Sequence, residues 1–184
     1  MLNKQKGHLG ENTMRHEKGF SLIELLIVVA IILIIAAIAI PNLMQARIAA
    51  NEASGVGSIQ ALKTAEVTYF NTYPTVGYAV QLADMSGAAP CIPSSTSACL
   101  IDSFLAASTP GSVGKSGFVF LATGINFGGL NSAFVVAASP VSVNKTGNRD
   151  FCSTNDGVLR QVRANVGDTP VTALAPCLAF PVAQ

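Results

Sequence analysis

Histidine and tryptophan are the residues in which this sequence is poorest. Tryptophan is absent, and the only histidines are His8 and His16, which both precede a long apolar segment. Catalytic sets such as Ser-His-Asp and Cys-His use histidine as a base, and many metal centres use it as a ligand. The chain after Gly19 has no histidine for these roles, and its sequence shows no cluster that would replace one. We therefore expect no enzymatic activity, no cofactor and no metal site.

Charged residues are also scarce, at 11% of the chain, and 11 Lys and Arg nearly balance 10 Asp and Glu. After the residues before Phe20 are set aside, 7 basic and 8 acidic residues are left. Basic side chains gather in the last third of the chain, but acids lie among them, and solvated strand faces explain them equally well. Binding to nucleic acid is therefore not supported. These basic residues are Lys145, Arg149, Arg160 and Arg163, and the acids are Asp150, Asp156 and Asp168.

The most prominent feature of the sequence is an apolar segment from Phe20 to Ile40, in which Glu24 is the single charge. As a helix it would be about 31 Å long, close to the thickness of the hydrocarbon layer of a bilayer. Nothing else in the chain is large enough to cover it on all faces, so we predict a membrane-embedded helix. The residues before it carry a positive net charge, which favours a cytoplasmic N-terminus.

Glu24 is costly in hydrocarbon, so it should either lie at the membrane interface or neutralise a cation. The interfacial position is the simpler interpretation. A cut after Gly19 would create an amino group on Phe20, one helical turn before Glu24, and the two opposite charges could then pair. Between two copies packed side by side, the same pair would also set their register along the helix axis.

The residues around Glu24 resemble a known motif. The run Lys-Gly-Phe-Ser-Leu-Ile-Glu-Leu-Leu-Ile-Val-Val-Ala-Ile-Ile, residues 18–32, is similar to the processing and methylation motif of type IV prepilins and of the related type II secretion pseudopilins. The resemblance implies that a prepilin peptidase cleaves between Gly19 and Phe20 and methylates the new amine. It also implies that Glu24 pairs with the terminal amine of a neighbouring subunit in a filament.

The same resemblance implies an α+β, pilin-like fold, in which a long N-terminal helix packs on an antiparallel sheet of about four strands. The chain would polymerise with itself through that helix. Its other expected partners are the prepilin peptidase, an inner-membrane assembly platform and an assembly ATPase. The precursor would reside in the inner membrane and the filament at the cell surface. A type II secretion pseudopilin, a minor pilin and, less favoured, a signal-anchored extracytoplasmic enzyme are the alternatives.

We expect three parts along the chain. Residues 1–19 form a leader that is cleaved, and Met14 offers a second start that would shorten it. Residues 20–73 form the long helix, with the membrane span at about 20–41. Residues 74–184 form a globular head.

Within the long helix, Pro41 removes a backbone hydrogen bond, which predicts a kink or a short unwound segment. By resemblance, it is the proline beside which pilin helices loosen. Gly55 and Gly57 predict a second weak point, since glycine lowers helix propensity. Beyond Pro41 the sequence becomes amphipathic, and we expect the helix to end near Tyr69. The expected inner face is Ile48, Glu52, Val56, Ile59, Leu62 or Lys63, Val67 and Phe70.

The head should begin with a connector at 74–116, rich in Pro, Gly, Ser, Ala and Thr, which by resemblance is the variable αβ loop of pilins. A short helix is expected at 102–107, and Asp156-Gly157 predicts a two-residue turn. The expected apolar anchors of the connector are Leu82, Met85, Ile92, Leu100 and Ile101. The expected strands are 118–121, 133–137, 149–152 and 158–162.

The four cysteines all follow the apolar segment, on the side that the charge rule places outside the cytoplasm. An even number of cysteines in an oxidising compartment favours two disulfides. Of the three connectivities we favour Cys91 with Cys99 and Cys152 with Cys177, and the second resembles the C-terminal disulfide loop of many type IV pilins. A four-cysteine zinc site is disfavoured, because paired Cys-x-x-Cys spacing is missing.

Two further patterns are weak. Asp150, Asn155 and Asp156 carry oxygen ligands that suit calcium, but such residues in turns usually bond their own backbone. Asn144-Lys145-Thr146 matches an N-glycosylation sequon, a pattern that often arises by chance. Neither pattern leads us to expect a site.

Overall fold

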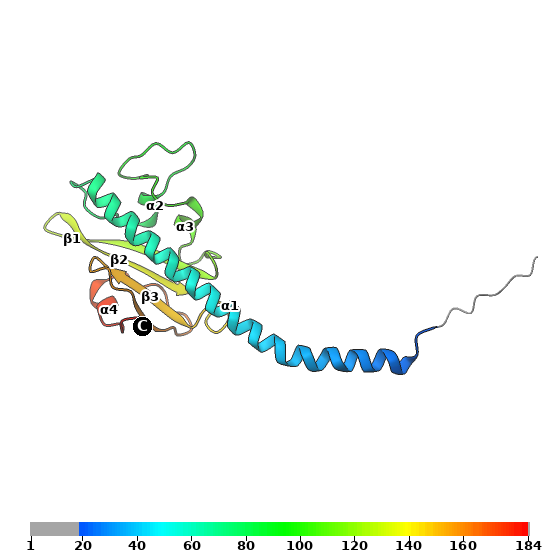
Figure 1. Cartoon of the computed structure of the whole chain (residues 1–184). Coiled ribbons are helices and arrows are strands. Elements are labelled where there is room, and N and C mark those ends of the chain that lie inside the picture. The colour runs from blue at the N-terminus through cyan, green and yellow to red at the C-terminus, as the bar shows by residue number, and fades with distance from the viewer. Residues whose placement is uncertain (1–18, 184) are drawn as a thin grey trace, which may run out of the picture. The chain divides into compact units, whose positions relative to one another are not determined.

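The computed structural model describes residues 19–183, so the expected leader up to residue 18, with Met14, lies outside this range. The chain is α+β and pilin-like, with a long N-terminal helix and an open four-stranded antiparallel sheet, as predicted (Figure 1). It divides into two compact units between Ile40 and Pro41. The elements are α1 (Leu22–Thr72), α2 (Leu82–Met85), α3 (Ser103–Ala107), β1 (Phe118–Phe127), β2 (Leu130–Pro140), β3 (Arg149–Thr154), β4 (Arg160–Arg163) and α4 (Leu174–Leu178).

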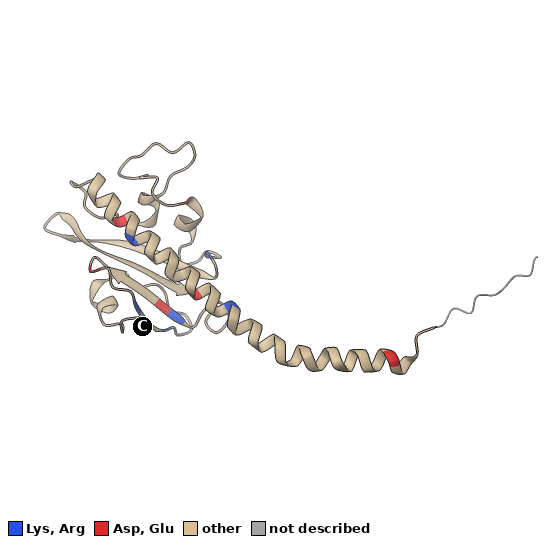
Figure 2. Ribbon diagram, in the orientation of Figure 1, with Lys and Arg blue, Asp and Glu red and all other residues tan. Residues whose placement is uncertain are grey.

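The first unit contains the part of α1 before Pro41. It is long and apolar enough to cross a membrane, and none of its most hydrophobic stretch is buried within the protein. Between Leu22 and Ile40, Glu24 is the one charged residue (Figure 2). This stretch contains the residues expected to lie in a membrane.

We expected a kink or a short unwound segment at Pro41; helix α1 is continuous through it, so the chain is not unwound there. A proline within a helix has no N–H to donate to the carbonyl four residues earlier. For Pro41 this is the carbonyl of Ala37. The residues on both sides of Pro41 are nevertheless helical. Gly55 and Gly57 do not interrupt the helix either.

Beyond Pro41, one face of α1 packs on the sheet. Of the expected inner positions, Glu52, Ile59 and Leu62 are buried, but Val67 is 50% exposed, so its prediction is wrong. The buried face of α1 continues to Tyr69 instead, because a helix with 3.6 residues per turn brings positions 62, 65, 66 and 69 to one side. The buried residues of α1 are Glu52, Gly55, Ser58, Ile59, Leu62, Ala65, Glu66 and Tyr69.

The sheet has the strand order β1-β2-β3-β4, with every neighbouring pair antiparallel. All four strands were predicted, although β1 and β2 are longer than the expected runs. Side chains alternate between two faces. Phe120, Phe134 and Phe151 lie on the face that packs against α1. Val135, Ala137 and Cys152 lie on the opposite face, which we call the outer face; there they pack with Cys177 of α4.

Gly55 of α1 faces β1. A Cβ atom there would lie 3.4 Å from the ring of Phe118 on β1, at the short end of ordinary van der Waals contact. The Phe118 ring is fully buried. The glycine that suggested a weak point in the helix therefore lies at the contact between α1 and the sheet.

The connector between α1 and β1 carries two short helices. The expected helix at 102–107 is confirmed as α3, whose N-terminus is capped by the Asp102 side chain accepting from the backbone N–H of Leu105. Helix α2 was not predicted. Leu82 and Met85 of α2 are buried as expected, whereas Ile92 is 81% exposed and does not anchor the connector.

The connection from β3 to β4 is longer than the expected two-residue turn. Five residues, 155–159, separate the two strands, and the backbone N–H of Gly157 donates to the carbonyl of Thr154. Gly157 has a positive φ of 75°, which glycine adopts without strain.

Candidate assembly site

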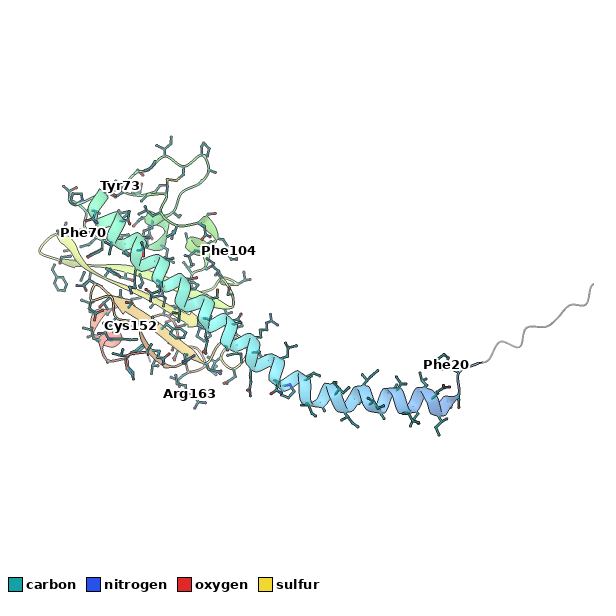
Figure 3. All side chains as sticks on the ribbon, viewed as in Figure 1. Phe20, Phe70, Tyr73, Phe104, Cys152 and Arg163 are labelled. Carbon is teal, nitrogen blue, oxygen red and sulfur yellow. A yellow bond between two sulfur atoms is a disulfide. The ribbon has the colours of Figure 1, made fainter. Side chains whose placement is uncertain are left out.

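The start of α1 carries the residues expected to take part in processing and assembly. Gly19 and Phe20 precede the helix, and the Phe20 side chain is 87% exposed (Figure 3). The peptide bond between them lies in non-helical chain, which is the kind of backbone that a peptidase can bind in an extended form.

Glu24 lies in the first turn of α1 and is exposed. Its carboxylate accepts a long hydrogen bond, 3.4 Å, from the backbone N–H of Ser21. Ser21 and Glu24 have the Ser-x-x-Glu spacing of a capping box, in which the acid satisfies a free donor at the helix start. Negative charge in this position is also favoured by the helix dipole. Within one copy, Glu24 therefore has a structural role as a cap, and its carboxylate is accessible to a cation.

The apolar side chains that follow Glu24 form a continuous exposed surface. Their exposed fractions run from 46% at Val29 to 80% at Leu22. A water-exposed surface of this size is unfavourable by roughly 25 cal/mol for each Å², so lipid or other protein must cover it. Its largest members are Leu22, Ile23, Leu25, Leu26, Ile27, Val28, Val29, Ile31, Ile32, Leu33, Ile34, Ile35, Ile38 and Ile40.

In the head, Glu52 ties α1 to the start of β3. One of its oxygens accepts from the backbone N–H of Asn148 at 2.7 Å, and the other accepts from Arg149 Nε at 2.9 Å. Arg149 also lies over the ring of Phe151, 5.6 Å from its centre. Both oxygens of a buried carboxylate are thereby paired, as burial of a charge requires. The periodicity of the sequence placed Glu52 on the inner face but gave no sign of its partner.

Glu66 ties α1 to the connector. Its side chain is fully buried, and Oε2 accepts from the backbone N–H of Ala79 at 2.9 Å. Within residues 19–183, Oε1 has no hydrogen-bond partner. Burial raises the pKa of Glu66 to about 8, opposed by the Ala79 hydrogen bond and assisted by the nearby charge of Asp84. Glu66 is therefore a neutral acid near neutral pH, a state that sequence patterns alone do not signal.

The structure joins Cys91 to Cys99 and Cys152 to Cys177, so no cysteine in the described part of the chain is free. The first bond closes a small loop of the connector. The second fixes α4 to β3 on the outer face of the sheet, where both sulfur atoms are buried (Figure 3). The C-terminal segment is therefore covalently held against the sheet.

The Cys152–Cys177 bond should contribute more to stability than the Cys91–Cys99 bond. Its cysteines are 25 positions apart instead of 8, so it removes more chain entropy from the unfolded state. We expect the double variant Cys152→Ala with Cys177→Ala to lose about 3.5 kcal/mol, and Cys91→Ala with Cys99→Ala about 2.6 kcal/mol. Guanidinium unfolding of the full chain in detergent measures both. Equal losses, or a larger loss for the second variant, would contradict the ranking.

The candidate calcium residues do not come together. Asp156 pairs with Arg160, whose two guanidinium nitrogens donate to the Asp156 carboxylate at 3.2 and 2.6 Å. This hydrogen-bonded pair lowers the pKa of Asp156 to about 2, and the backbone N–H of Val158 adds to the effect. Asp150 lies elsewhere, buried on the outer face. Among residues 19–183, no group of three or more His, Cys, Asp or Glu side chains is placed to hold a metal ion.

Comparison with known proteins finds similarity at the start of the chain. The family described as "Prokaryotic N-terminal methylation motif" matches residues 14–40, which include Gly19, Phe20 and Glu24. The type IV wide pilus major component PilA4 of Thermus thermophilus is 67% identical over 39 residues, 21% of this chain and 30% of that relative. In this region the chain is similar to type IV pilins. No solved structure matches it.

Two other pilins show the same restricted likeness. The type IV major pilin protein PilA of Myxococcus xanthus is 46% identical over 54 residues, which are 29% of this chain and 24% of the relative. A fimbrial protein of Pseudomonas aeruginosa is 52% identical over 52 residues, 28% of this chain and 34% of the relative. The chain thus aligns with only a quarter to a third of the length of these pilins, and the alignments do not extend over the whole head.

Proposed function

We propose that this chain is a structural subunit of a type IV pilus filament, assembled through the helix that starts at Phe20. The observation that carries the proposal is the combination of a pilin-type N-terminal motif with an apolar helix whose side chains are exposed within residues 19–183. The named relatives are pilus components, which supports a structural role over an enzymatic one.

The expected processing step removes residues 1–19 by hydrolysis of the Gly19–Phe20 bond. Hydrolysis leaves a positive amino group on Phe20, and methylation keeps that charge. Glu24, exposed in the first turn of α1, then provides the opposite charge. In the low dielectric of packed apolar helices, a cation and a carboxylate attract each other much more strongly than in water. Pairing between neighbouring subunits would align successive helices and would remove the cost of an isolated charge.

Polymerisation would also solve the exposure of α1. While the subunit is in the inner membrane, lipid covers the apolar surface between Leu22 and Ile40. In a filament, the same surfaces of neighbouring copies would cover one another, so a subunit can leave the membrane without exposing them to water. A prepilin peptidase, an assembly platform and an assembly ATPase are the partners that this route requires. Pro41 would lie at the boundary between the packed helices and the heads.

Intact-mass measurement of sheared surface fibres tests the proposal. We expect the main subunit to begin at N-methylated Phe20 and to be four hydrogens lighter than the reduced chain, because it contains two disulfides. Recovery of the same processed mass only in the inner membrane would contradict the role of main filament subunit and would point to a pseudopilin or a minor pilin. An uncleaved mass would contradict the processing step.

A further inference from the structure

Two arginines lie beside α1 at the end of the sheet where the helix first packs on it. Glu52, the first buried residue of α1, pairs with Arg149 at the start of β3. Arg163, the last residue of β4, lies opposite Arg149 across the two strands, and residues paired in this way point to the same face of a sheet. Arg163 is therefore on the face that packs against α1, and it is exposed there (Figure 3).

Two further basic side chains lie beside the neighbouring face of α1. The side-chain amide of Asn51 donates to the backbone carbonyl of Thr146 at 3.0 Å, which holds the loop between β2 and β3 against the helix. Lys145 is exposed in that loop. Arg47 is also exposed, and it precedes Asn51 by one helical turn on the same face of α1. We call the four basic residues the basic end: Arg47, Lys145, Arg149 and Arg163.

The basic end has few acids to balance it. Glu52 is already paired with Arg149. Asp150 follows Arg149 and points to the outer face, because side chains alternate along a strand. Asp168 is exposed in the turn after β4, where its Oδ2 accepts from the backbone N–H of Asn165 at 2.7 Å. Within residues 19–183, three of the four basic residues form no ion pair: Arg47, Lys145 and Arg163.

The position of Arg47 along α1 relates the basic end to a membrane. Arg47 is the first charged residue after Glu24. About 35 Å of helical rise separates the two, which is more than the hydrocarbon layer of a bilayer and less than a whole bilayer. With Glu24 at one membrane interface, Arg47 therefore reaches the headgroup layer of the other. The rest of the basic end belongs to the same compact unit as Arg47, a unit that begins at Pro41.

We propose that the basic end binds the headgroups of anionic phospholipids, so that the head docks on the bilayer surface while the subunit is in the membrane. This proposal rests on the membrane position of α1 in the proposed function, but it does not require a filament. An anionic surface attracts each Lys or Arg that lies near it, and a guanidinium can donate two hydrogen bonds to one phosphate.

Exposed apolar side chains next to the basic end favour a lipid surface over a soluble anion. Val141 starts the loop that carries Lys145 and is 46% exposed. Val166 lies in the turn after Arg163 and is 90% exposed. A soluble phosphate would engage only the basic groups, whereas the boundary between headgroups and acyl chains accepts basic and apolar side chains together.

Acylation of lysines by an uncharged reagent tests the contact in the full chain. The chain is inserted into vesicles of phosphatidylcholine, with or without phosphatidylglycerol, and mass spectrometry of peptides gives the rate at each lysine. An anionic surface shields an amine pressed against it, so Lys145 should react about threefold more slowly in the anionic vesicles. Lys63, several turns further along α1 and bonded to the carbonyl of Gly157, should react equally in both. High salt should remove the difference at Lys145, because it screens the attraction.

A matched pair of variants tests the role of the basic end. Arg163→Gln should weaken docking about fivefold and remove most of the protection of Lys145, and the exposure of Arg163 makes the change compatible with folding. Arg160→Gln removes the same charge from the same strand, but Arg160 is paired with Asp156 at the other end of β4. This control should keep the protection seen in the wild type.

Three results would overturn docking on lipid. Equal rates at Lys145 in both kinds of vesicle, or equal protection in Arg163→Gln and the wild type, would exclude it. Protection that is the same in neutral vesicles and grows with the number of subunits per vesicle would show that a second copy covers the basic end instead. A chain that floats with neither kind of vesicle would overturn the membrane position of α1 as well, whereas the first two results leave the proposed function intact.

Discussion

Glu24→Ala should reduce surface filaments by more than a hundredfold while the amount of subunit in the inner membrane stays the same. Membrane insertion depends on the apolar residues after Glu24, which the substitution leaves intact. Assembly would lose the carboxylate that pairs with the Phe20 amine of a neighbour. Removing one partner of a buried ion pair costs about 3 to 5 kcal/mol, and each 1.4 kcal/mol is a factor of ten in association. Quantification of sheared fibres against membrane subunit measures the effect.

Glu24→Gln separates this pairing from the capping role seen in the structure. A glutamine side chain can still accept the hydrogen bond from the Ser21 N–H, but it cannot neutralise a cation. If Glu24 acts by charge, Glu24→Gln should fail to assemble like Glu24→Ala. If Glu24 acts only as a helix cap, Glu24→Gln should form filaments at the wild-type level, which would contradict the pairing.

The membrane-embedded start of α1 could be predicted from the sequence because its signal depends only on residues that are close together in the chain. An apolar run with one acid needs only its length and composition to indicate a membrane helix, and the structure leaves that run uncovered. The strands could be predicted for a similar reason, because short runs of β-branched and aromatic residues between glycines indicate a strand without knowledge of the rest of the fold. The ends of these elements depend on neighbouring strands, which explains why β2 extends to Pro140, beyond the predicted run.

The pairing of the buried polar groups in the head could not be predicted in this way. Glu52 pairs with Arg149, which lies 97 positions away in the sequence. The burial of Glu66 depends on Ala79, whose backbone provides its partner. Periodicity shows which side of a helix faces inward, but it does not show which hydrogen-bond partners lie on the segments packed against that side. The sequence pattern therefore does not reveal how a buried acid is paired.

Glu66 should make the head less stable as the pH rises. Its pKa is about 8 in the folded chain, against an ordinary value of 4.5, so the folded state binds more protons between these two values. Stability is therefore fully present below about pH 4.5 and is lost as the pH rises through about 8. One such proton changes the free energy of unfolding by about 1.4 kcal/mol per pH unit, and the total loss has an upper bound of roughly 5 kcal/mol.

Glu66→Gln should remove this loss, because glutamine resembles the protonated acid and can still accept from the Ala79 N–H. We expect the variant to be more stable than the wild type at pH 9 and close to it at pH 5, by guanidinium unfolding of the full chain in detergent. Asp84→Asn should give a smaller change in the same direction, since the charge of Asp84 helps to raise the pKa of Glu66. Parallel stability curves for wild type and Glu66→Gln from pH 5 to 9 would show that Glu66 titrates normally, in contact with water.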